Sequence, residues 1–193
     1  MAHTVHLTRL DMEHAAPPAR MVLDDTRKSL GFIPNLYAAM ANNPALLRAY
    51  TQGYQALREH SGLTPIELEI VFLAISRENG CDYCVSAHSF IADRVSKVPA
   101  DVTAAIRDRR PIADSKLAAL VDFTVAMVRT RGLPTSVEVG AFLAAGYHEQ
   151  NMLAVVAAIG VKVMSNYTNH LFDNPVDDSF AAYSWTAADS VAA

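Results

Sequence analysis

Residues 64–88 read TPIELEIVFLAISRENGCDYCVSAH, a sequence that predicts two consecutive helices joined by a tight turn. Thr64, Pro65 and Glu67 form a strong helix start. A hydroxyl can cap the helix, proline suits its first position, and glutamate three residues after the cap completes a capping box. The apolar run that follows predicts a helix that continues to about Asn79.

Gly80 follows this helix and can adopt the left-handed backbone conformation that ends helices. A second helix is therefore expected to begin at Cys81 or Asp82 and to run toward Val95. No segment of the chain shows the alternation of a strand bounded by hairpin turns, so the fold class is all-α. Caps and helical spacing predict further helices over residues 44–60, 100–108, 114–130, 135–145 and 148–171.

The length of 193 residues suits one all-helical domain, 1–193, with a core over about residues 20–175 and an extended tail over 176–193. A net charge of −4 argues against a nucleic-acid partner. No apolar run reaches the roughly 20 residues of a membrane span, and the longest one, residues 152–164, is interrupted by Lys162. The first twenty residues lack the features of a secretory signal, so we expect a cytoplasmic protein without a membrane partner.

Cys81, Cys84 and His88 follow the pattern C-x-x-C-x-x-x-H, which is typical of redox chemistry or of half a metal site. At helical spacing the three side chains share one face. The N-terminus of a helix stabilises a thiolate, and a histidine one turn later can take its proton. If the two helices fold back antiparallel at Gly80, Glu69 ends near His88 and Cys84 and can orient the histidine.

Several polar residues have more ordinary interpretations. Glu69 fits either the core or an exposed helix face, and Glu67 is best explained by the capping box. His148 and His170 are candidate ligands only if a metal is bound. The arginine-rich segment 107–110 is typical of a solvated helix end.

The spacing of Glu69, eleven intervening residues and the Cys81, Cys84 and His88 pattern resembles the signature of the alkylhydroperoxidase D-like superfamily. That superfamily also includes carboxymuconolactone decarboxylases. Residues 31–36, 43–47 and 76–80 resemble the corresponding segments of its peroxidase-related subgroup. The resemblance covers about residues 20–175 and implies a helical bundle with the C-x-x-C pair at the N-terminus of a central helix.

The resemblance also implies a reaction. Cys84 would attack a hydroperoxide, Glu69 and His88 would relay protons, and Cys81 would close a redox-active disulfide. Helix-dipole reasoning alone favours Cys81 instead, because it is nearer the helix N-terminus. Tyr83 departs from the family, whose well-studied members have histidine at this position.

The resemblance also bears on cofactors and partners, and it implies neither a cofactor nor a metal. A dithiol resembling dihydrolipoamide or thioredoxin would reduce the disulfide, and the chain would form a homo-oligomer, a trimer or a hexamer. Two other functions stay open from the sequence. One is a redox-sensing or zinc-binding module that uses Cys81, Cys84, His88 and perhaps His170. The other is a carboxymuconolactone decarboxylase-like enzyme, which is disfavoured because that branch does not depend on a C-x-x-C pair.

Overall fold

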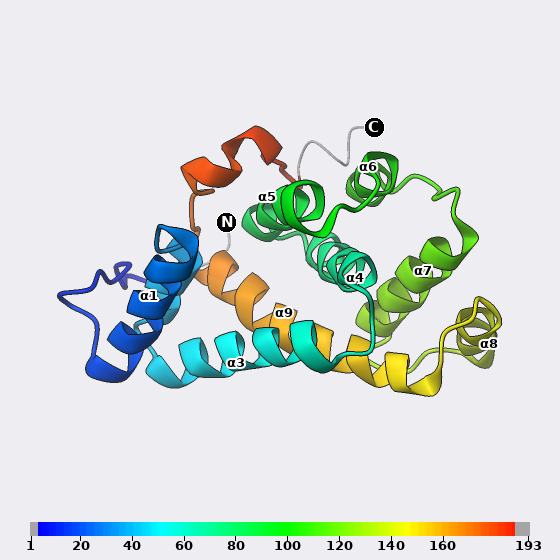
Figure 1. Cartoon of the computed structure of the whole chain (residues 1–193), viewed down its shortest axis with the longest axis horizontal. Coiled ribbons are helices and arrows are strands. Elements are labelled where there is room, and N and C mark those ends of the chain that lie inside the picture. The colour runs from blue at the N-terminus through cyan, green and yellow to red at the C-terminus, as the bar shows by residue number, and fades with distance from the viewer. Residues whose placement is uncertain (1–3, 188–193) are drawn as a thin grey trace.

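The computed structural model describes residues 4–187, and over this range the chain contains helices and no β-strand (Figure 1). The all-α prediction is therefore confirmed. The α-helices are α1 (Pro17–Leu30), α2 (Asn35–Met40), α3 (Pro44–His60), α4 (Pro65–Glu78), α5 (Asp82–Ile91), α6 (Ala100–Asp108), α7 (Ser115–Arg129), α8 (Ser136–Ala144) and α9 (Glu149–Phe172). A π-helical turn, η1 (Ala92–Ser96), extends α5, and a 3-10 helix, η2 (Asp178–Tyr183), follows α9.

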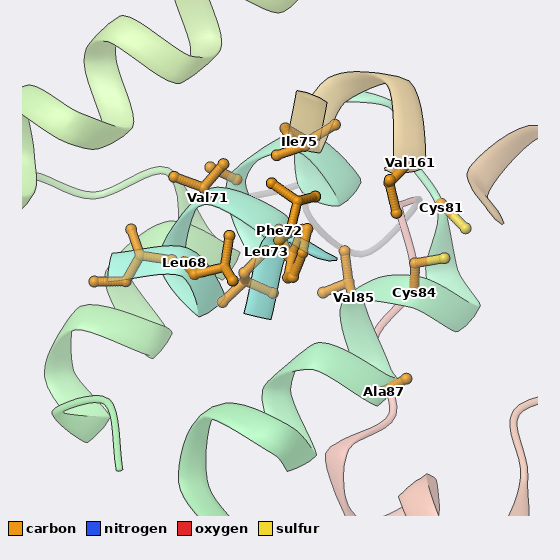
Figure 2. Close-up of a cluster of buried hydrophobic side chains, with 14 of the residues drawn as sticks. Leu68, Val71, Phe72, Leu73, Ile75, Cys81, Cys84, Val85, Ala87 and Val161 are labelled. Atoms are coloured by element: carbon orange, nitrogen blue, oxygen red, sulfur yellow. The ribbon is translucent and has the colours of Figure 1, made fainter. Parts of the chain in front are cut away.

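Helix α4 is the centre of the molecule. Its start is the predicted capping box, in which Thr64 accepts a hydrogen bond from the Glu67 amide and the Glu67 carboxylate accepts one from the Thr64 amide. Every residue from 67 to 77 is buried, as expected for a helix that is apolar on nearly all sides. Figure 2 shows α4 side chains, among them Phe72, packed beside side chains of α5 and α9.

The turn between α4 and α5 has the predicted form. Gly80 adopts a positive φ of 65°, and Cys81 is the N-cap residue of α5. Helix α5 then packs against α4. The α-helix ends at Ile91 rather than Val95, because the last turn widens into η1.

Helix α9 has 24 residues and packs against both α3 and α4 (Figure 1). Its buried face is unexpectedly polar, since Lys162, Asn166 and Asn169 are all hidden from solvent. Within residues 4–187 no helix combines the length and the apolar character needed to cross a membrane.

The prediction that residues 176–193 form an extended tail is wrong for the part that contains η2. Phe180 and Trp185 are buried, and the Trp185 amide donates a hydrogen bond of 3.1 Å to Ser86 Oγ on α5. The Arg107 guanidinium, expected to be solvated, donates hydrogen bonds to the carbonyls of Tyr183 and Ser184. The segment has no helix cap or long apolar period, and its fold depends on these distant contacts. Residues 188–193 lie outside the described part of the chain.

Candidate active site

The two cysteines lie at the start of α5 and are both reduced and buried, with exposed fractions of 1% for Cys81 and 2% for Cys84. They differ in what they face. Cys84 lines a cavity of about 250 Å³, and Cys81 is not among the residues of its wall. Cys84 is therefore the thiol that faces the cavity, whereas helix-dipole reasoning alone favours Cys81 as the reactive thiol.

The surroundings of Cys84 favour its thiolate. Burial by itself raises the pKa of Cys84, but a hydrogen bond from the Cys81 thiol, the charge of Lys162 and the neighbouring His88 and Asn166 together hold it well below the usual value. Asn169 Nδ2 also donates a hydrogen bond of 3.2 Å to Cys84 Sγ. Burial and the hydrogen bond to Cys84 raise the pKa of Cys81, so Cys81 remains a protonated thiol.

The two asparagines beside Cys84 are held in orientation by other amides. Asn174 Nδ2 donates to Asn169 Oδ1 at 2.8 Å, and Asn79 Nδ2 donates to Asn166 Oδ1 at 2.8 Å. Each carbonyl oxygen is thus occupied, which leaves the Nδ2 group free to turn toward sulfur. Asn166 Nδ2 is buried without a hydrogen-bond partner within residues 4–187, and the neighbouring Asn166 amide contributes to the lowered pKa of Cys84.

Glu69 lies in the core with an exposed fraction of 0%, beside His88 as the antiparallel arrangement predicts. Glu69 Oε1 is 2.5 Å from His88 Nδ1, and Glu69 Oε2 accepts a hydrogen bond from Arg58. Burial alone raises the pKa of Glu69, but His88 and Arg58 outweigh it and lower the pKa. Glu69 is therefore ionised, and because a carboxylate only accepts hydrogen bonds, His88 carries its proton on Nδ1.

The other ring nitrogen of His88 faces a residue that sequence reasoning did not identify. His88 Nε2 is 2.7 Å from Nζ of Lys162, whose exposed fraction is 0%. Burial and the charge of Lys162 lower the pKa of His88, so the imidazole is neutral and Nε2 accepts from the ammonium. The hydrogen-bonded chain therefore runs from Glu69 through His88 to Lys162.

The cavity in front of Cys84 has mainly aromatic and aliphatic walls. Tyr50 is 4% exposed, and its hydroxyl makes no hydrogen bond within the described part of the chain. Burial raises the pKa of Tyr37 to about 12 and raises that of Tyr50 well above its usual value, so both hydroxyls are neutral donors. The cavity is lined by Thr26, Ser29, Leu30, Pro34, Leu36, Tyr37, Tyr50, Tyr54, Tyr83, Cys84, Ala87, His88, Ile91, Lys162 and Phe180.

Tyr83, at the position where the sequence resemblance implies a histidine, takes part in a different interaction. Its hydroxyl donates a hydrogen bond to the Asp177 carboxylate, and burial with this neighbouring charge raises the pKa of Tyr83. Tyr83 thus fastens the segment before η2 to α5 and does not serve as a base. Of the two remaining candidate histidines, His148 is the N-cap residue of α9 and His170 is exposed beside the Tyr167 ring.

Four residues of the site were not identified from the sequence: Arg58, Lys162, Asn166 and Asn169. The three α9 residues are spaced by four and three positions, so they share one helix face. A signal existed for Lys162, since it interrupts an otherwise apolar run. A solvent-exposed lysine would interrupt the run in the same way, so only the tertiary structure shows that Lys162 is buried.

Comparison with known proteins agrees with this fold. Residues 44–126 match the sequence model of the Carboxymuconolactone decarboxylase family. The structure resembles an alkylhydroperoxidase AhpD core, an uncharacterized peroxidase-related protein from Ralstonia eutropha JMP134, with a TM-score of 0.79 and 24% identity over 93% of this chain and 96% of that one. No curated protein gives a significant sequence match.

Two more solved structures have the same fold. An uncharacterized peroxidase-related protein from Silicibacter sp. TM1040 has a TM-score of 0.74 and 21% identity, over 93% of this chain and 97% of that one. The apo form of the debrominase Bmp8 has a TM-score of 0.74 and 23% identity, over 93% and 96%. The chain is an all-α protein of the alkylhydroperoxidase D-like fold. This fold and the family match over residues 44–126 agree with the resemblance that the cysteine signature indicated.

Proposed function

We propose that the protein is a thiol-dependent peroxidase that reduces organic hydroperoxides and acts through Cys84 and Cys81. The observation that supports it best is the contrast between the two thiols. Cys84 faces the cavity as a stabilised thiolate, while Cys81, a protonated thiol, is hydrogen-bonded to it. One thiolate to attack and one adjacent thiol to resolve are what a two-cysteine peroxidase requires.

The proposed reaction proceeds in two steps. The Cys84 thiolate attacks the terminal oxygen of the hydroperoxide, the O–O bond breaks, and the alkoxide leaves and takes up a proton. Cys84 is then a sulfenic acid, and the Cys81 thiol attacks its sulfur, releasing water and closing the disulfide. A dithiol resembling dihydrolipoamide or thioredoxin returns both cysteines to thiols. We infer an organic hydroperoxide because the cavity is larger and more apolar than hydrogen peroxide needs.

In this proposal Glu69 and Arg58 are positioning residues. Their ion pair fixes the orientation and tautomer of His88, and His88 in turn holds Lys162 beside the cavity. The hydrogen-bonded chain of Glu69 and His88 is thereby extended by one residue, to Lys162.

Steady-state consumption of cumene hydroperoxide in the presence of dihydrolipoamide tests the proposal. We expect turnover by the wild-type protein and none by Cys84→Ser. Cys81→Ser should reduce one equivalent of hydroperoxide and then stop, because the sulfenic acid has no resolving thiol. Equal turnover by Cys84→Ser and the wild type would refute the proposal.

Reductive dehalogenation is a second candidate, favoured by the aromatic walls of the cavity. One solved structure of this fold is a cysteine-to-alanine variant of the debrominase Bmp8 in complex with 2,3,4-tribromopyrrole, with a TM-score of 0.72. In such a reaction the Cys84 thiolate would take the halogen from the ring, the ring carbon would take a proton, and the Cys81 thiol would displace halide and close the disulfide. Bromide release from a brominated pyrrole, compared with hydroperoxide consumption, distinguishes the two candidates.

A zinc-binding module is less consistent with the geometry. Both ring nitrogens of His88 already have partners, Glu69 and Lys162, so metal binding would require the buried ammonium to move away. His170, the fourth proposed ligand, is exposed beside Tyr167. Metal analysis of protein purified without chelator tests this alternative, and near-stoichiometric zinc would favour it over the peroxidase.

We also propose that the chain forms a homo-oligomer through α9. The helix buries its polar face on the site and exposes apolar side chains on the other, among them Leu153, Val156, Tyr167 and Leu171. A second copy would cover these side chains. Light scattering coupled to size exclusion tests this, with a trimer or hexamer expected and a monomer contradicting it.

A further inference from the structure

Lys162 is a fully buried lysine whose head group lies at the cavity. Its Nζ is 2.7 Å from His88 Nε2, and its side chain lines the same cavity wall as Cys84. A lysine is rarely buried completely unless its charge is balanced, because removal of an ammonium from water is costly. The question is which group balances it.

The surrounding charges leave one candidate. Arg58 and Glu69 form an ion pair and cancel, and His88 is neutral. The titratable groups that face Lys162 or its cavity from α2, α3, α4 and α5 are Tyr37, Tyr50, Tyr54, Arg58, Glu69, Cys81, Tyr83, Cys84 and His88. The tyrosines and Cys81 have raised pKa values and are uncharged. The Cys84 thiolate is therefore the anion that balances Lys162.

The proposed reaction removes the charge balance between Cys84 and Lys162. When Cys84 becomes a sulfenic acid it loses its negative charge, and Lys162 is left as a buried cation without a counterion. In the same step the leaving group becomes a strongly basic alkoxide that needs a proton. Transfer of a proton from the ammonium to the alkoxide removes both charges at once.

We propose that Lys162 is the catalytic acid that protonates the alkoxide leaving group. This inference rests on the proposed peroxidase function. In the balanced step, the thiolate, the ammonium and ROOH become the sulfenic acid, the neutral amine and ROH. Reduction of the disulfide by the dithiol later supplies a proton to the amine and restores the thiolate and the ammonium.

His88 is less suited to be the proton donor. Its Nδ1 proton is directed at Glu69 and its Nε2 accepts from Lys162, so no proton of the ring faces the cavity. His88 is thus a positioning residue that aims Lys162. This differs from the direct relay between His88 and Cys84 that the sequence resemblance implies.

Two oxidants with different leaving groups test the role of Lys162. The leaving group of tert-butyl hydroperoxide is an alkoxide that requires a proton, whereas the leaving group of peracetic acid is acetate, which does not require one. We would measure the rate of Cys84 oxidation by each oxidant in Lys162→Met and Lys162→Arg. Arginine keeps the positive charge but does not give up a proton, because its pKa is too high.

In both variants the ratio of the alkyl hydroperoxide rate to the peracid rate should fall by about 10²-fold or more, the usual contribution of a general acid. The ratio is internal to each sample, so partial loss of folded protein does not affect it. Lys116→Met is the matched control. Lys116 forms an ion pair of 3.0 Å with Glu67 and does not line the cavity, so the ratio of the two rates in Lys116→Met should equal that of the wild type.

Equal slowing with both oxidants would show that Lys162 acts only through its charge and would overturn the inference. Wild-type protein that reacts with neither oxidant would overturn the peroxidase function and the Lys162 role with it. If neither variant folds, the solvent deuterium isotope effect on the wild-type protein decides the matter. We expect a larger effect with tert-butyl hydroperoxide than with peracetic acid, and equal effects would contradict the assignment.

Discussion

Two glutamates of α4, Glu67 and Glu69, are separated by one residue and have opposite uses. Glu67 closes the capping box with Thr64 and forms an ion pair with Lys116 near the surface. Glu69 lies in the core, where it binds Arg58 and orients His88. Positions i and i+2 of a helix point about 200° apart, so the two carboxylates face opposite sides of α4.

The difference shows that one helix can carry a glutamate that stabilises its N-terminus and another that orients a residue of the proposed active site. Glu67 satisfies backbone donors that every helix start must satisfy, and its surroundings include solvent. Glu69 is buried, and its charge is tolerated because Arg58 and His88 supply donors to both oxygens. Loss of Glu69 should therefore affect both stability and chemistry, whereas loss of Glu67 should affect stability alone.

The largest expected effect is that of Glu69→Gln. The change removes the carboxylate that orients His88 and leaves Arg58 without its counterion. We expect the free energy of unfolding to fall by about 3–5 kcal/mol, as when a buried pair loses one member. Cys84 oxidation by tert-butyl hydroperoxide should slow at least about tenfold, because Lys162 is no longer aimed. Chemical denaturation and stopped-flow kinetics measure the two effects, and unchanged values for both would contradict the assigned role.

Removal of Arg58 together with Glu69 tests whether the unpaired Arg58 charge causes the loss of stability. In the double variant Arg58→Met with Glu69→Gln the partly buried Arg58 cation is no longer left without its counterion, so part of the lost stability should return. The rate of Cys84 oxidation should stay low, because His88 still lacks its carboxylate. A double variant less stable than Glu69→Gln alone would show that the charge of Arg58 is not the source of the cost.

The third prediction concerns pH. The pKa values of Cys84, His88 and Glu69 are all lower in the folded protein than in the unfolded chain, so the unfolded state binds more protons. The stability of the reduced protein should therefore rise with pH up to about 8.5, where an unfolded cysteine titrates. Cys84 contributes at most about 1.4 kcal/mol per pH unit, between its folded pKa and 8.5. Denaturation curves between pH 6.5 and 8.5 should be flatter for Cys84→Ser, and identical slopes would argue against a folded-state thiolate.

The smallest expected effect is that of Glu67→Gln, the matched control for Glu69→Gln. Glutamine keeps part of the capping box but loses the ion pair with Lys116, so we expect a stability loss of about 1 kcal/mol or less. Peroxide reactivity should equal that of the wild type. If Glu67→Gln slows Cys84 oxidation as much as Glu69→Gln does, the division of roles on α4 is wrong.

The part of the site that could be predicted from the sequence is the part built from local structure. The capping box, Gly80 and helical spacing bring Glu69 to His88, because only one tight turn separates α4 from α5. Lys162 lies 74 positions after His88 in the sequence, and its direction depends on how α9 packs across α3 and α4. No local pattern distinguishes a lysine that enters a core from one that leaves it.

The C-terminal segment and Tyr83 illustrate the same limit. Tyr83 stands where the sequence resemblance implies a histidine, and its hydroxyl donates a hydrogen bond to Asp177, 94 positions away. The short helix η2 that follows is held by aromatic packing, including Phe180 against Phe90, and not by caps of its own. The roles proposed for Cys81 and Cys84 come from the sequence resemblance, whereas Lys162, Asn166 and Asn169 of α9 are found beside Cys84 only in the structure.

In the proposed function Cys84 and Cys81 form a redox pair in which Cys84 reacts first. Titration of free thiols before and after one equivalent of cumene hydroperoxide, with mass spectrometry of the peptide that spans residues 78–94, tests it most directly. We predict the loss of both thiols and a mass decrease of about two hydrogens in the wild type, and a single sulfenic acid on Cys84 in Cys81→Ser. Two unreacted thiols, or oxidation of Cys81 with Cys84 intact, would contradict the account.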